Sequence, residues 1–198
     1  TGTNLANAST ILDGLTFASG GEVIFGDDVT DQVTLSTDNV TIDAVGKIVS
    51  NALIDGAFDL TTESDISVSF KANVGANTLL TALNVSTPEA YISDNIFTTG
   101  NQEYNRSGSF SSQEILIHSN DTGTNSLLQG NQLKVNGYLR QDTGEGEFKL
   151  NFKRVPLLTP FVTEADYYQN SKKSFNLTTS RQTAIHSIGD SEVVSVPG

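Results

Sequence analysis

Residues 66–72 read Ile-Ser-Val-Ser-Phe-Lys-Ala, and this stretch decides the class of fold. Its apolar side chains occupy alternate positions, which places them on one side of an extended strand and the serines and the lysine on the other. Residues 147–153, Glu-Phe-Lys-Leu-Asn-Phe-Lys, repeat the pattern. The sequence therefore predicts strands that cover a core with one face and meet solvent with the other.

Similar short segments recur along the chain, separated by Asp-Asp, Thr-Asp-Asn and Asp-Gly turn residues. Further strands are expected at 22–25, 31–36, 39–43, 46–50, 52–60 and 110–119. Short strands at this spacing suit a sandwich or barrel, so we predict an all-β antiparallel β-sandwich (jelly-roll or Ig-like) with extended terminal arms. The alternative is a partly parallel β-helix in residues 22–72, against which stands the absence of a fixed sequence period.

Within this sandwich, residues 132–141 are expected to form a hairpin with 147–155 around the turn Asp142–Gly146. A rival turn lies at Asn136-Gly137, a favoured type I′ pair. In the longer hairpin four apolar side chains face the core. They are Leu139, Phe148, Leu150 and Phe152.

The expected domain organisation is an N-terminal arm over 1–20, a core domain over 21–158 and a C-terminal arm with short strands over 159–198. Helix is expected in two short places only. Thr87-Pro88-Glu89 opens one candidate that runs to about Ile96, with proline at the first helical position. Residues 163–166 could cap another turn.

Composition favours an extracellular β protein, because asparagine, serine, threonine and glycine are abundant and charged residues make up only 17% of the chain. The chain has no cysteine, which excludes disulfides, thiolate zinc sites and a cysteine nucleophile. It has no methionine and begins at Thr1, which predicts a chain at the cell surface or outside the cell after removal of a leader, or alternatively in a virion. Since no run of 18 apolar residues occurs, membrane insertion is not expected.

Charge is unevenly distributed. Residues 1–70 hold eleven acids and a single base, Lys47, so nucleic acid is an unfavourable partner. Asp27, Asp28 and Asp31, with Asp38 following, supply hard oxygen ligands in turns between strands, which predicts a calcium site. The spacing is not that of an EF-hand, and solvated acids in loops are the plainer interpretation.

No enzymatic constellation is evident. Asp121-Thr-Gly123 and Asp142-Thr-Gly144 resemble the catalytic triplet of aspartic proteases, but polar neighbours indicate turns. His118 and His186 are the only imidazoles, and neither belongs to a spaced metal-binding set. The sequence therefore predicts a protein that is not an enzyme.

The predicted function is that of an extracellular structural subunit, which assembles with its own copies into a surface filament or matrix fibre by β-strand exchange. The alternatives are a virion structural protein (capsid, tail or decoration) and a carbohydrate-binding module with a polysaccharide or glycan as partner. The expected exchange positions are apolar residues near the two ends. They are Ile11, Leu15, Phe17, Phe175, Leu177, Val194 and Val196.

Overall fold

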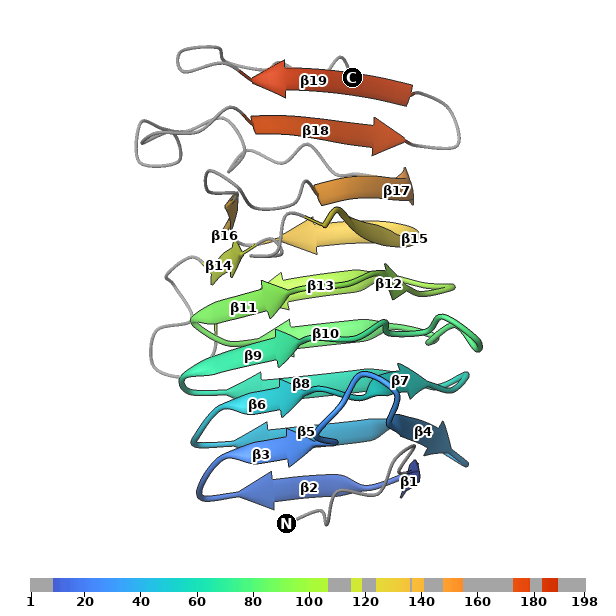
Figure 1. The fold of residues 1–198 in the computed structure, drawn as a ribbon, viewed down its shortest axis with the longest axis vertical. Coiled ribbons are helices and arrows are strands. Elements are labelled where there is room, and N and C mark those ends of the chain that lie inside the picture. Colours follow the sequence, from blue (N-terminus) through green and yellow to red (C-terminus); the bar gives the residue numbers. More distant parts are fainter. Residues whose placement is uncertain are drawn as a thin grey trace.

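The computed structural model describes residues 9–106, 115–118, 124–135, 137–140, 148–154, 173–178 and 183–188. The chain winds through about five turns of a β-solenoid, and strands of successive turns stack in parallel along its long axis, except that the last described pair, β18 and β19, is antiparallel (Figure 1). The all-β prediction is confirmed and the antiparallel sandwich is wrong, whereas the alternative of a parallel β-helix fits.

Each early turn contributes one strand to each of three sheets, which we call faces one, two and three. Face one contains β1 (Ser9–Asp13), β4 (Gln32–Ser36), β7 (Leu53–Asp55), β12 (Ile96–Phe97), the first part of β15 (Ser126–Val135), β17 (Phe148–Arg154), β18 (Lys173–Thr178) and β19 (Thr183–Ile188). Face two contains β2 (Thr16–Ser19), β5 (Val40–Ala44), β8 (Leu60–Ser64), β10 (Leu83–Ser86), β13 (Gln102–Asn105) and the end of β15. Face three contains β3 (Val23–Phe25), β6 (Ile48–Ser50), β9 (Ser67–Phe70), β11 (Glu89–Ile92), β14 (Ile115–His118) and β16 (Gly137–Arg140).

The core is a set of apolar columns that run along the solenoid. On face one, Ile54 pairs with Val74, Val74 with Ile96, and Ile96 with Leu128, and all four side chains are buried. Burying each such side chain contributes about 1.5–3 kcal/mol. In strands such as β4, β5, β8 and β10, buried positions alternate with more exposed ones, so one side of each strand fills a common core while the other side is nearer to solvent.

Two glycines allow the turns to approach one another closely. Gly56 has φ +135° and Gly75 has φ +74°, a region that favours glycine. A Cβ atom at Gly56 would lie 2.4 Å from the Leu35 carbonyl oxygen, and one at Gly75 would lie 2.2 Å from that of Phe97. Both positions therefore need a residue without a side chain.

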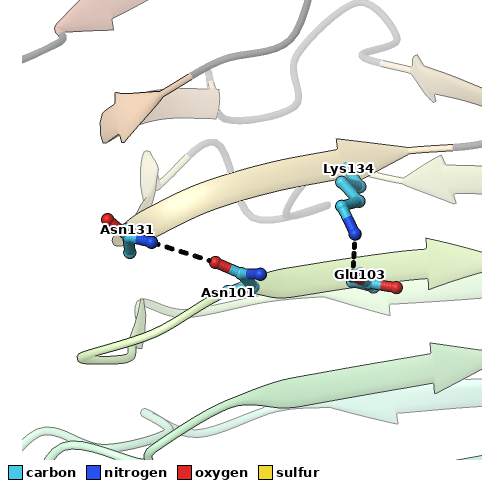
Figure 2. Close-up of polar contacts among 4 residues, drawn as sticks. All are labelled: Asn101, Glu103, Asn131 and Lys134. Atoms are coloured by element: carbon cyan, nitrogen blue, oxygen red, sulfur yellow. Dashed lines mark hydrogen bonds and ion pairs between the residues drawn. The ribbon is translucent and has the colours of Figure 1, made fainter.

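Polar side chains join successive turns on the outside. Asn131 Nδ2 donates to Asn101 Oδ1 at 3.2 Å, and Lys134 Nζ forms an ion pair with Glu103 (Figure 2). Asn95 Nδ2 likewise donates to Asn73 Oδ1 at 2.9 Å at a corner of the solenoid. Such contacts align equivalent positions of neighbouring turns.

Turn length varies, and this hides the repeat in the sequence. The contacting residues Asn39 and Asp59 are 20 positions apart, whereas Glu103 and Lys134, also in neighbouring turns, are 31 positions apart. Because loops at the corners absorb the difference, the strands stay in register without a fixed period.

Two local predictions are wrong. The expected hairpin of 132–141 with 147–155 does not form, because β15 and β17 run parallel and β16 pairs with β14, also in parallel. The rival turn at Asn136-Gly137 would likewise require antiparallel neighbours, and β16 does not pair with β15. The helix expected from Thr87 to Ile96 is instead β11 and the start of β12. The turn expected at 163–166 lies outside the described residues.

Candidate functional site

An open hollow of about 630 Å³ lies on the outer surface of face three. It forms because β9 places two small side chains, Ser67 and Ser69, at its outward positions. In the parallel register Ser69 lies between Val49 and Tyr91 of the neighbouring strands, and all three line the hollow. The remaining lining residues are Glu22, Lys47, Asp65, Ile66, Lys71, Pro88 and Glu89.

Tyr91 forms an aromatic wall of this hollow and is held from two sides. Its ring stacks on the imidazole of His118 with centroids 4.5 Å apart and an interplanar angle of 7°. Its hydroxyl donates to Glu89 Oε2 at 2.5 Å, and His118 Nε2 lies 4.0 Å from the same oxygen. The ring is therefore oriented before any ligand arrives, which lowers the entropy cost of binding.

Charges of both signs surround the serine floor. Glu22, Asp65 and Glu89 are acidic, whereas Lys47 and Lys71 are the first two bases of the chain. Within the described residues neither lysine forms an ion pair. The hollow therefore offers hydrogen-bond donors and acceptors beside an exposed aromatic face.

The acids proposed for calcium serve as turn-capping groups. Asp27, Asp28 and Asp31 share the turn between β3 and β4, where buried Asp31 accepts the backbone N–H of Asp27 at 2.9 Å. Asp28 Oδ1 accepts the backbone N–H of Thr30 at 2.8 Å. Asp38 lies in the loop between β4 and β5, where its Oδ1 accepts the backbone N–H of Asn39 at 2.7 Å. In the part of the chain that is described, no group of three or more potential metal ligands occurs. Calcium binding stays a prediction.

Those predicted exchange residues that the structure describes lie in or next to β1, β2 and β18, toward opposite ends of the solenoid (Figure 1). Ile11 on β1 and Phe17 on β2 are exposed, and Leu15 between these strands is half-buried. Phe175 and Leu177 lie on β18, which pairs with β17 of the same chain. Val194 and Val196 are outside the described residues. Strand exchange between copies stays a prediction.

Sequence reasoning missed the hollow, although one signal for it was present. The alternation in 66–72 places Ser67, Ser69 and Lys71 on one solvent-facing side. Nothing local shows that Lys47 and Tyr91 flank them, because that depends on the pairing of β6, β9 and β11.

No family model, curated protein or solved structure matches this chain. In the described residues there is also no helix that is long and apolar enough to cross a membrane. The function is therefore inferred from the surface of the solenoid itself.

Proposed function

We propose that this protein binds a glycan, without catalysis, in the hollow on face three. The observation that carries the proposal is the pre-oriented ring of Tyr91 beside the floor formed by Ser67 and Ser69. An extracellular setting, which the composition favours, suits such a ligand.

The chemistry of the hollow matches that of a sugar. A pyranose ring has an apolar C–H face that can pack on an aromatic ring, while its hydroxyls need donors and acceptors at the edge. The Tyr91 ring supplies the apolar contact, since the side chain is 36% exposed. The serine hydroxyls, the lysines and the carboxylates around it supply the polar partners.

The open form of the site predicts modest affinity. An exposed hollow buries only part of a ligand and leaves many hydroxyls in water. A single site of this kind is expected to bind with a Kd between about 1 µM and 1 mM, or roughly −8 to −4 kcal/mol. Several copies on one surface would raise the effective affinity.

Calorimetric titration with neutral and acidic oligosaccharides tests the proposal. At least one of these ligands should bind, and Tyr91→Ala should weaken that binding by roughly tenfold or more, or about 1.4 kcal/mol. Tyr91→Phe should retain most of the affinity, because the ring and its stacking partner remain.

Ile24→Ala is the matched control. Ile24 is 57% exposed on the same face and does not line the hollow, so its removal should leave binding unchanged. Binding by Tyr91→Ala at wild-type strength, or no binding by any member of the panel, would show that the proposal is wrong.

A further inference from the structure

The three faces end together at the N-terminal end of the solenoid. β1, β2 and β3 are the terminal strands of their sheets, and among the described residues no strand pairs with their outer edges. An open strand edge presents unpaired N–H and C=O groups, which are a template for pairing with another chain. Here three such edges surround one core.

The apolar core is also open at this end. Phe17 pairs in register with Ile42, whose side chain is buried, so Phe17 points along a core column. It is nevertheless 47% exposed, and Leu12, in register with buried Leu35, is only partly covered. In the second turn of the solenoid the equivalent side chains, Ile42 and Leu35, are buried because the first turn packs against them. The first turn therefore exposes side chains that every inner turn buries.

Charge favours one kind of partner. Residues 1–70 hold eleven acids and one base, whereas residues 134–181 hold eight bases and five acids. The described strands of the two segments, β1 to β9 of the first and β17 and β18 of the second, lie toward opposite ends of the long axis (Figure 1). Two N-terminal ends in contact would bring like charges together, whereas an N-terminal end against a C-terminal end brings opposite charges together.

We propose that the N-terminal end of the solenoid is an assembly surface for the C-terminal end of a second copy. A second copy fits because β19 is the last strand of its sheet among the described residues, so its open edge can continue face one at β1 while the same contact covers the open core beside Phe17. Because the two surfaces differ, the contact does not close, and repetition produces a filament. No arm has to leave its own domain, which distinguishes this arrangement from strand exchange.

Light scattering on the 198-residue chain, with electron microscopy of the same samples, tests the proposal. The mean mass should rise with protein concentration at about 50 mM salt and should rise less at about 500 mM, where screening is stronger. Phe17→Asp should raise the concentration needed for assembly by roughly tenfold or more, because it buries a charge beside open strand edges. Its circular dichroism spectrum should match that of the wild type.

Val45→Asp is the matched control, since Val45 is 57% exposed but follows β5 on the side of the solenoid. It should assemble like the wild type, and so should Tyr91→Ala, because the hollow on face three is separate from the end. A chain that stays monomeric at every concentration and salt level would overturn the proposal. So would a closed dimer that grows stronger with salt, or equal loss of assembly in Phe17→Asp and Val45→Asp.

Discussion

Tyr104 shows how a single polar residue is accommodated in the core of the solenoid. Its side chain is fully buried on β13, and its hydroxyl donates to Gln102 Oε1 at 2.9 Å. Gln102 is buried as well, and its Nε2 donates to the Gln129 carbonyl oxygen at 2.9 Å. The phenol is therefore satisfied only in its neutral form, and burial raises the pKa of Tyr104 far above its usual value.

This burial predicts a loss of stability in alkali. In the unfolded chain the Tyr104 phenol ionises at about pH 10, whereas in the folded protein it keeps its proton. The contribution of neutral Tyr104 to the free energy of unfolding is therefore complete below this pH and decreases above it. Tyr104→Phe should reduce the decline of the free energy of unfolding above pH ~10 by up to about 1.4 kcal/mol per pH unit. Urea denaturation of both proteins between pH ~8 and ~11 measures this, and equal slopes would contradict it.

Ser67 and Ser69 show the opposite case, in which small residues shape the surface. Both occupy outward positions of β9, beside the larger side chains of Val49 and Tyr91 on the adjacent strands. A large side chain at Ser69, which is half-buried, would fill the hollow, whereas Ser67 is already only 7% exposed and enclosed by its neighbours. The shape of the hollow is therefore most sensitive to the residue at Ser69.

At the scale of the element, β17 shows that the alternation of apolar residues predicts which side chains are buried but not the direction in which the strand runs. Phe148, Leu150 and Phe152 are buried, as predicted from their positions in 147–153. Leu139 lies on β16, and its side chain is outside the described set. The strand direction was wrong, since β17 lies parallel to β15, with Leu128 opposite Leu150.

The facing of β17 can be tested with two neighbouring substitutions. Leu150→Ala should lower the free energy of unfolding by about 2–5 kcal/mol, because it leaves a cavity in the column next to Leu128. Lys149→Ala should change it by no more than about 0.5 kcal/mol, because Lys149 alternates with the buried positions. Chemical denaturation gives both values, and equal small effects would remove the assignment of faces.

The segment from Thr87 to Ile96 shows local preference overridden by pairing. Pro88 would suit the first position of a helix, but its carbonyl oxygen accepts the Leu116 N–H at 3.0 Å. The residues that follow form β11 between β9 and β14, which pair with it on both edges. The hydrogen bonds to two neighbouring turns outweigh a short helix that would stand alone.

At the scale of the whole molecule, the solenoid predicts an elongated particle (Figure 1). A compact domain of 198 residues has a radius of gyration of about 16 Å. Because adjacent strands lie only about 4.8 Å apart, about five stacked turns lengthen the particle modestly, so its radius of gyration should stay near this value. Small-angle X-ray scattering of the monomer, collected at high salt and low concentration, should nevertheless give an asymmetric distance distribution. A symmetric distribution, as a globular sandwich would give, would contradict the stacked turns.

The sequence by itself determined that the protein is all-β and which side chains of strands such as β9 and β17 point inward. It could do so because inward and outward positions alternate within a single strand, whatever its partner is. It also placed Ser67, Ser69 and Lys71 together on the solvent side of one strand.

Only the tertiary structure decided that the strands run parallel, which turns stack, and that Tyr91 and Lys47 flank the two serines. Parallel sheets are usually buried on both faces, whereas these have one solvated face, so their alternation has the same pattern as that of antiparallel strands. The direction and register of a strand depend on the length and course of the loop that connects it to the next strand. Because the corner loops differ in length, the sequence has no fixed period from which the stacking of the turns could be predicted.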